Sequence, residues 1–229
     1  MISVIVITYN RAHFLADALD SIERQTFRDF EIIIVDDGST DNTKEIADKY
    51  EGIRYIRQEH SGISKARNTA VKAAKGMWIA FLDSDDLWKE DKLQKQVDYI
   101  KKHQDCRIVY TKYQNFTDIL EDELNDGQKM LLHSNIDWCL PSALIDIKLF
   151  DEIGMFDENL VYGEDTDWNL RLRFFRVDMN HCIGEPLYLR RIHESNISNN
   201  GKELSNLDFW KVVTAAYRKT KRFEKCIKT

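Results

Sequence analysis

Proline and glycine are scarce in this chain, which has two prolines, Pro141 and Pro186, and nine glycines in 229 residues. The sequence therefore contains no Pro/Gly/Ser-rich linker, and it shows no internal repeat and no low-complexity tract. Although the length alone permits one α/β domain or two small ones, the absence of a linker favours one.

Cysteines are also few and widely spaced. The four of them are separated by 33, 43 and 44 residues, at Cys106, Cys139, Cys182 and Cys226. This spacing matches neither a Cys-x-x-Cys metal site nor a dense disulfide framework. We expect free thiols that mostly serve packing.

No apolar run approaches the roughly 20 residues that cross a bilayer. The amino terminus lacks a basic region and a small-residue cleavage site, and Thr8-Tyr9-Asn10 interrupts its apolar run. These absences predict a cytoplasmic protein.

An excess of positive charge is lacking except at the carboxyl end. The formal net charge is −6, which argues against a general nucleic-acid binder. Residues 211–229, however, hold seven Lys/Arg and one acid, so the rest of the chain carries about −12. We predict a basic helical tail over residues 206–229. It is interpreted as a solvated amphipathic helix that closes the domain, with peripheral contact to the anionic inner face of a membrane as the open alternative.

Short apolar runs alternate with helical patterns in the first half of the chain. Residues 3–8, 31–35 and 77–82 are nearly continuous apolar runs, and residues 53–57 read as a further strand. Asp41-Asn42-Thr43 predicts the cap of a helix that runs to about residue 50. Ser64 predicts the cap of another helix, which Gly76 would end. The alternation predicts a parallel sheet with right-handed crossovers.

Three of the predicted strand ends are polar. They are Thr8-Tyr9-Asn10-Arg11, Asp36-Asp37-Gly38-Ser39 and Asp83-Ser84-Asp85-Asp86. Ligands of such sheets bind beyond the carboxyl ends of the strands, so we expect these segments to share one rim. Arg67, in the first turn after Ser64, is expected to face the same rim.

The second half of the chain is less regular. Residues 106–113 predict a strand, whereas residues 114–137 show no clear period and are expected to form a loop region that is mobile or depends on a partner. A strong helical pattern covers residues 168–176. It follows Gly163-Glu164-Asp165-Thr166-Asp167, where Asp165 or Thr166 could simply cap the helix.

The pair Asp83 and Asp85 has the Asp-x-Asp spacing that can hold a divalent cation beside a diphosphate. Taken alone, acidic residues after a strand are more often loop or capping groups, and Asp86 in particular could cap a helix that begins near Trp88.

Five ordered motifs together resemble the large family 2 glycosyltransferases. They are the segments at residues 3–11, 34–43, 61–68 and 82–86, followed by Gly154-Met155-Phe156-Asp157-Glu158 with Gly163-Glu164-Asp165. The resemblance covers roughly residues 2–193. It implies an α/β fold, a single GT-A type nucleotide-sugar-binding domain with a mostly parallel, Rossmann-like sheet flanked by helices. It further implies residues 1–205 as this domain, with a nucleotide-sugar-binding half at 1–105 and an acceptor and catalytic half at 106–205.

The resemblance also implies roles for single residues. The nucleotide-sugar donor, with UDP favoured as its nucleotide, would be bound by Thr8, Tyr9, Arg11, Asp37, Arg67, Asp83 and Ser84. Tyr9 has a face suited to stacking on a base, and Asp37 can accept a hydrogen bond from base or ribose. Arg67 could instead belong to a surface salt bridge.

A metal and a base complete the implied site. Mn²⁺ or Mg²⁺ would be held by Asp85, with Asp83 and His193 as further candidates. Asp165 would take the proton of an acceptor hydroxyl, on a saccharide or another molecule, in an inverting displacement. Glu164 is the neighbouring candidate for that role. Trp138 and Trp168 could line a sugar pocket or belong to the core.

Two other enzyme classes fit less well. A sugar nucleotidyltransferase would need a glycine-rich loop after its first strand, where this chain has Tyr9-Asn10-Arg11-Ala12-His13. A haloacid-dehalogenase-type phosphatase has its Asp-x-Asp near the start of the chain, with Thr or Val where Leu87 stands here. The alternative that remains is an inactive nucleotide-sugar-binding partner of a larger synthase.

Overall fold

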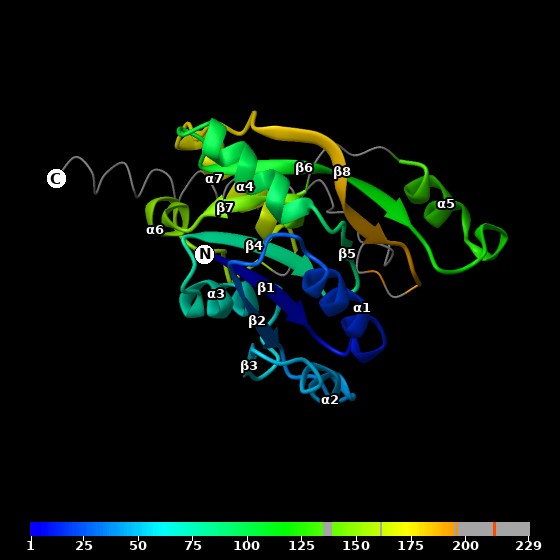
Figure 1. Cartoon of the computed structure of the whole chain (residues 1–229). Helices are drawn as coiled ribbons and strands as arrows, with labels where there is room; N and C mark the ends of the chain where they lie inside the picture. Colours follow the sequence, from blue (N-terminus) through cyan, green and yellow to red (C-terminus); the bar gives the residue numbers. More distant parts are fainter. Residues whose placement is uncertain (135–138, 161, 195, 197–212, 214–229) are drawn as a thin grey trace.

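The computed structural model describes residues 1–134, 139–160, 162–194, 196 and 213 (Figure 1). In chain order the elements are β1 (Ile2–Thr8), α1 (Ala12–Glu23), β2 (Phe30–Asp36), α2 (Thr43–Ala47), β3 (Ile53–Arg57), α3 (Ile63–Ala73), β4 (Trp78–Asp83), β5 (Leu87–Trp88), α4 (Lys92–Lys102), β6 (Ile108–Phe116), η1 (Glu121–Glu123), α5 (Asp126–Leu132), η2 (Leu140–Ser142), β7 (Leu144–Asp146), α6 (Lys148–Ile153), α7 (Glu164–Phe174) and β8 (Cys182–Arg191). The predicted strand–helix alternation is therefore present from β1 to β4.

The described strands form one sheet in the order β3-β2-β1-β4-β7-β6-β8-β5. The pairings among β1, β2, β3 and β4 are all parallel, as is that of β6 with β8. β7 runs antiparallel to β4 and β6, and β5 runs antiparallel to β8. The predicted mostly parallel α/β sheet is confirmed, and each antiparallel pairing involves β7 or β8.

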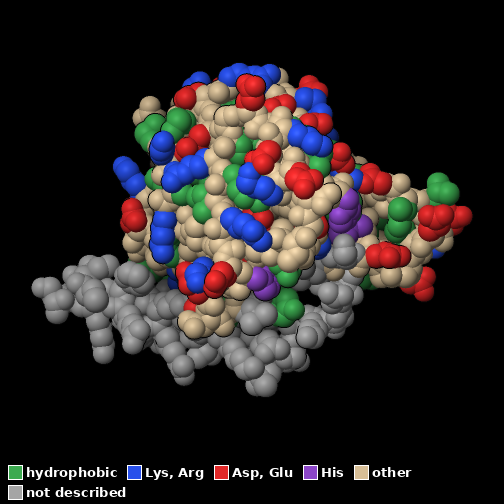
Figure 2. All heavy atoms as spheres, turned by 90° about the horizontal axis from the view of Figure 1, so that it is seen from below, with side chains coloured by type: hydrophobic (Ala, Val, Ile, Leu, Met, Phe, Trp, Pro, Cys, Tyr) green, Lys and Arg blue, Asp and Glu red, His purple; other side chains and the backbone are tan. Residues whose placement is uncertain are grey.

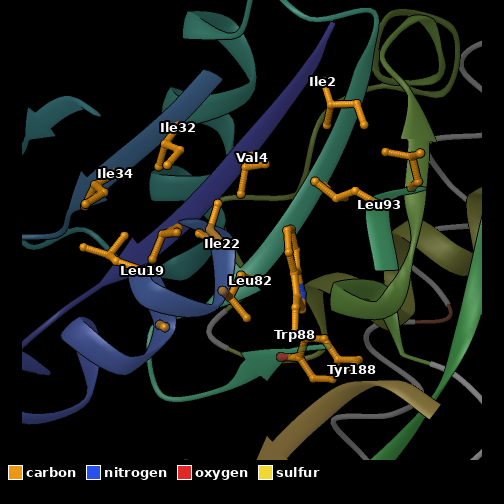
Figure 3. Packing of buried hydrophobic residues seen from close by; sticks show 14 of the residues in the cluster. Ile2, Val4, Leu19, Ile22, Ile32, Ile34, Leu82, Trp88, Leu93 and Tyr188 are labelled. Carbon is orange, nitrogen blue, oxygen red and sulfur yellow. The ribbon is translucent and has the colours of Figure 1, made fainter. Parts of the chain in front are cut away.

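Each face of the sheet packs on its own set of helices. Alternate residues of β1 point to opposite faces: Val4 joins the core beneath α1 and α4, and Ile5 joins the core beneath α3, α6 and α7. Figure 3 shows the first core, where Leu19 and Ile22 of α1 pack on strand residues that include Val4. Burying an aliphatic side chain of this size contributes about 1.5–3 kcal/mol. With helices on both faces, the ends of the strands are the part of the sheet that remains uncovered.

Both predicted boundaries of α3 were wrong, and α2 ends at Ala47, before the predicted end near residue 50. α3 begins after Gly62 without a side-chain cap, and Ser64 lies inside the helix, where its hydroxyl donates to the Leu160 carbonyl. α3 also ends at Ala73, before Gly76. A Cβ at Gly76 would lie 2.5 Å from the amide nitrogen of Ser3. Glycine is required there for the close approach of two chain segments, a reason that helix periodicity does not reveal.

Of the segment at residues 114–137, the described part, residues 114–134, contains more regular secondary structure than predicted. β6 continues to Phe116, and α5 begins with a capping box between Asn125 and Gln128. Figure 1 shows α5 projecting from the body beyond the end of β6. In Figure 2 acidic side chains gather on this projecting arm, to which η1 and α5 contribute Glu121, Asp122, Glu123 and Asp126.

Two further predictions concern the thiols and the carboxyl end. Cys106, Cys139 and Cys182 are free, as expected, whereas Cys226 lies outside the described residues. The predicted tail helix at residues 206–229 lies outside them too, apart from Val213. Within the described part of the chain, no helix has the length and apolar character needed to cross a membrane.

Candidate active site

The three polar strand ends do share one rim. In the sheet register Thr8 lies beside Asp36, and Ile7 lies beside Asp83. The chain leaves the sheet at this edge after β1, β2 and β4, so the segments that begin at Tyr9, Asp37 and Ser84 emerge side by side. Parallel pairing is what aligns these ends, and the sequence prediction of a common rim is confirmed.

Tyr9 and Asp37 form one side of this rim together with a residue that the sequence interpretation missed. Tyr9 is 41% exposed, and its ring stacks on the imidazole of His60, with ring centroids 4.1 Å apart. Asp37 is buried, and its carboxylate accepts hydrogen bonds from the amides of Ser61 and Gly62. The only signal for His60 was its position just before the Ser61-Gly62 turn, in a loop without periodicity.

Arg67 crosses the middle of the rim as a buried bridge. Its guanidinium donates to Glu164 Oε1 at 2.5 Å and lies 3.5 Å from Asp83 Oδ1. The ring centroids of Phe81 and Phe156 lie 5.7 and 5.6 Å from the guanidinium carbon. The surface salt bridge considered for Arg67 is therefore wrong, since the side chain is 5% exposed and joins α3 to β4 and α7.

Asp85 lies among basic groups. Its Oδ2 is 3.1 Å from His193 Nε2 and 3.5 Å from Arg11 Nε. Burial disfavours the charged form of Asp85, but the hydrogen bond and charge of His193 and the charge of Arg11 outweigh it, so the pKa lies below its usual value. The structure thus brings together Arg11, Asp85 and His193 from three separate segments.

The environment of Asp83 is the opposite. Burial raises its pKa above the usual value, and the nearby carboxylates of Asp85 and Glu164 act in the same direction, against the charge of Arg67. Adjacent carboxylates that are partly withdrawn from water repel each other, and a bound cation relieves that repulsion. The two aspartates of the Asp-x-Asp pair are thus held with unequal proton affinity.

Asp86 does not cap a helix. The residues that follow it form β5, and its carboxylate accepts from the hydroxyl of Tyr188 and, at 2.7 Å, from the amide of Arg191. Burial raises the pKa of Asp86 well above its usual value, and the charges of Asp85 and Asp83 add to the effect. Asp86 therefore fastens the loop after β4 to the end of β8.

Arg191 completes this fastening from the other side and was also missed by the sequence interpretation. Its Nε donates to the carbonyl of Asp85 at 3.0 Å, and its other nitrogens reach Asp17 and Asp118. The side chain is 5% exposed although its sequence context, Arg190-Arg191, is that of an ordinary basic pair. By anchoring the last residues of β8, these bonds bring His193 to Asp85.

Glu164 and Asp165 both lie at the start of α7 but in different surroundings. Glu164 is buried, and its carboxylate is paired with Arg67. Asp165 is only half-buried, and its Oδ1 accepts from the amide of Thr166 at 2.7 Å. Of the two candidate bases, Asp165 is the one whose carboxylate is not engaged by a buried arginine.

The remaining predicted residues divide into rim and core. Thr8 and Ser84 are both buried, and Thr8 contributes its carbonyl to the rim by accepting from the amide of Asp37. Trp168 is fully buried, and its indole nitrogen donates to the Gly154 carbonyl at 3.0 Å. Of the two alternatives left open for Trp168, the structure supports the core and not the sugar pocket, while Trp138 lies outside the described residues.

The donor set near Asp85 fits a hard divalent cation in part. No group of three or more His, Cys, Asp or Glu side chains suited to a metal occurs within the described ranges. Asp85 and His193 nevertheless converge within 3.1 Å, on a rim where Asp83 adds a further carboxylate. Two or three protein ligands are what a cation shared with a phosphate ligand needs, because phosphate oxygens and water supply the others.

Comparison with known sequences gives a consistent result. The profile described as Glycosyl transferase family 2 matches residues 3–154. An uncharacterised glycosyltransferase of Rickettsia prowazekii (strain Madrid E) is 34% identical over 87% of this chain and 66% of its own length. Another, from Rickettsia typhi (strain ATCC VR-144 / Wilmington), is 32% identical over 96% of this chain and 72% of its own length.

Solved structures extend the similarity to the fold. TarS residues 1–349 of S. aureus in complex with UDP-GlcNAc has a TM-score of 0.75 and 25% identity, covering 95% of this chain and 66% of that one. The mannosyltransferase PcManGT of Pyrobaculum calidifontis, solved with GDP-Man and Mn²⁺, has a TM-score of 0.67 and 20% identity, covering 96% and 64%. The present chain thus spans about two thirds of these proteins.

Proposed function

This chain belongs to the family 2 glycosyltransferases, and on that premise we propose that it transfers a sugar from UDP to an acceptor hydroxyl in a metal-dependent, inverting reaction. The bridge from Asp83 through Arg67 to Glu164 carries the proposal. It ties the predicted metal pair to the start of the helix that holds the predicted base.

The donor would lie along the rim. Tyr9 and Asp37 receive the nucleobase, and Arg11 and Arg67 provide the positive charge near the diphosphate. UDP is favoured because TarS was solved with UDP-GlcNAc, and its similarity extends over 95% of this chain. We propose residues 1–105 as this donor-binding half.

Mn²⁺ or Mg²⁺ would be held by Asp85 and His193, with Asp83 close by. When bound, the cation offsets the charge that develops on the departing diphosphate. The protein prepares for it by keeping Asp85 ionised, since His193 and Arg11 hold its pKa below the usual value despite burial. Mn²⁺ in the PcManGT structure is consistent with this choice of metal on the same fold.

Asp165 would act as the general base. Its half-buried carboxylate can accept the proton of an acceptor hydroxyl as the oxygen attacks the anomeric carbon from the face opposite the diphosphate. Glu164 acts on this step indirectly, because its pairing with Arg67 fixes the first turn of α7. Such placement of a weak nucleophile and its base is typically worth about 10²–10⁴-fold in rate.

The acceptor would be a saccharide or another hydroxyl compound, bound mainly by residues 106–205 as the second half of the domain. The projecting arm offers an exposed apolar surface beside its acids, since Leu120 is 67% and Met130 is 73% exposed. We propose that the arm contacts the acceptor or the molecule that carries it. The reaction would then serve the assembly of a polysaccharide or glycoconjugate.

A donor screen tests the proposal. Thermal unfolding would be followed with a panel of UDP-, dTDP- and GDP-sugars, each with Mn²⁺, with Mg²⁺ and with EDTA. A donor at 100 times its dissociation constant should stabilise the fold by about 2.7 kcal/mol. For the stabilising donor, slow release of nucleotide that stops with EDTA, and an inverted anomer of the released sugar by ¹H NMR, would be expected. If a donor stabilised the fold but no nucleotide were released with any acceptor tested, the result would favour an inactive binding partner.

A further inference from the structure

His60 occupies the two interactions that the proposed donor site offers to a nucleobase. We propose that its imidazole is a placeholder for the base, which must swing out before the nucleotide binds. The inference rests on the proposed function, because Tyr9 and Asp37 are there assigned to the base. It adds that the site is closed by one of its own side chains.

The first shared interaction is stacking. The rings of Tyr9 and His60 lie 4.1 Å apart between centroids, with an interplanar angle of 18°. Planar nucleobases stack on tyrosine in the same manner. The two rings are also accessible, since the His60 side chain is 57% exposed and Tyr9 is 41% exposed. The imidazole therefore covers one face of Tyr9 from a position that solvent can reach.

The second shared interaction is a hydrogen bond to Asp37. His60 Nδ1 lies 2.8 Å from Asp37 Oδ2 and 3.1 Å from the carbonyl oxygen of the same residue. Both oxygens can only accept, so Nδ1 carries the hydrogen and donates it. The imidazole thus stacks on Tyr9 and donates an in-plane N–H to Asp37, as a pyrimidine base bound by these two residues would.

Asp37 has no acceptor site left for a base while His60 is in place. Its Oδ1 accepts from Gln58 Nε2 at 2.7 Å and from the Ser61 amide at 3.0 Å. Its Oδ2 accepts from the Gly62 amide at 2.9 Å in addition to His60. A carboxylate offers about four lone-pair positions. One of the four donors must leave before a nucleobase can bond to Asp37.

His60 is the donor that can leave without moving the chain. Ser61 and Gly62 donate through their backbone, and Gln58 is held at its other end by the Thr69 hydroxyl at 2.9 Å. The loop backbone itself packs on Gly38, where the φ angle is +87° and a Cβ would lie 2.8 Å from the His60 amide nitrogen. Rotation of the His60 side chain about its own bonds needs none of these contacts to change.

The replacement also restricts the base. The ligand that takes over from Nδ1–H must bring an N–H of its own, as uracil does at N3. Cytosine has no hydrogen at N3 and can donate only through its 4-amino group, so its N3 lone pair would lie close to the Asp37 carboxylate. UDP should therefore displace His60 more readily than CDP.

Calorimetric titration of the whole chain with UDP in the presence of Mn²⁺ tests the inference. His60→Ala removes the placeholder, so UDP should bind roughly fivefold to tenfold more tightly than to the wild type, since a stacked pair of this kind leaves the open state a minor one. His60→Asn, which keeps a donor for Asp37 but cannot stack, should fall between them. His103→Ala is the matched control, because His103 stacks on Tyr99 with centroids 4.1 Å apart and an angle of 17° at the end of α4.

NMR of the imidazole protons supplies a second readout. In the wild type the His60 signal should lose the ring-current shift of Tyr9 as UDP is added, the His103 signal should stay in place, and CDP at the same concentration should move the His60 signal less than UDP does. Weaker UDP binding by His60→Ala, or UDP binding that leaves the His60 signal unmoved, would overturn the placeholder and keep the donor site. If UDP bound to none of these proteins, the proposed donor site would be wrong and the placeholder with it.

Discussion

Arg67 donates a 2.5 Å hydrogen bond to Glu164, a residue 97 positions later in the chain, inside a buried environment. The same guanidinium lies 3.5 Å from Asp83, so one cation serves carboxylates on β4 and α7. This arrangement links the two halves of the proposed site through a side chain rather than through the sheet. Its removal should therefore affect stability and catalysis together.

Replacement of Arg67 by methionine should destabilise the fold by about 3–5 kcal/mol, because it leaves Glu164 buried without its partner. Urea unfolding measures this loss. The double variant Arg67→Met with Glu164→Gln should recover a large part of it, since the uncompensated charge is then removed. If the free-energy losses of the two single variants simply added in the double variant, the Arg67–Glu164 bridge would not be the source of the destabilisation.

The two candidate bases can be separated by isosteric changes. Asp165→Asn should lower kcat by about 10²–10⁴-fold, because an amide cannot take the acceptor proton, and it should leave the dissociation constant for UDP unchanged. Glu164→Gln should cost less than Asp165→Asn, since glutamine can still accept from Arg67. Initial rates at saturating donor and acceptor give kcat for both variants. The reverse order would assign the base to Glu164.

His193 should act on the metal more than on the donor. His193→Ala removes the group that holds the pKa of Asp85 down, together with a nitrogen ligand, so the Mn²⁺ concentration for half-maximal activity should rise by about 10–100-fold. His133→Ala, which removes an exposed histidine of the projecting arm, is the control and should leave it unchanged. A loss of kcat that Mn²⁺ does not restore would place His193 in another role.

Much of the rim could be predicted from the sequence, because it follows from local regularities. Continuous apolar runs mark the buried strands, and parallel strands align their carboxyl ends, so Tyr9, Asp37 and Asp83 could be placed on one edge before any contact was known. The family resemblance then assigned chemical roles to them. Those roles remain predictions, whereas their proximity is observed.

The groups that the sequence interpretation missed depend on distant contacts. Arg191 meets the Asp85 carbonyl across 106 positions, and its neighbours in sequence give no sign of burial. His60 lies in a loop whose shape follows from its bonds to Asp37. Trp168 was ambiguous for the same reason, because an aromatic residue on a helix can face a ligand or the core, and only the packing of α7 on the sheet decides.

Lys92, which lies outside the proposed site, predicts a pH dependence of the free energy of unfolding. This fully buried lysine donates to Gln96 Oε1 at 3.0 Å and lies 4.3 Å from the centre of the Trp88 ring. Burial lowers its pKa from 10.5 to about 7. Between these two values the unfolded chain holds the proton and the folded chain does not, so this residue makes stability rise with pH. Below about pH 7 both states are protonated, and the cost of the buried charge is present in full.

Replacement of Lys92 by methionine should therefore remove this slope. Relative to the wild type, the variant should gain about 2–3 kcal/mol more at pH 6 than at pH 9. The loss of a donor to Gln96 lowers stability at both pH values and cancels in the comparison. Lys101→Met on the same helix is the control, since the Lys101 side chain is 69% exposed, and it should leave the pH dependence unchanged. Urea unfolding at the two pH values measures the difference, and an equal effect of Lys92→Met at both would show that Lys92 stays protonated in the folded protein.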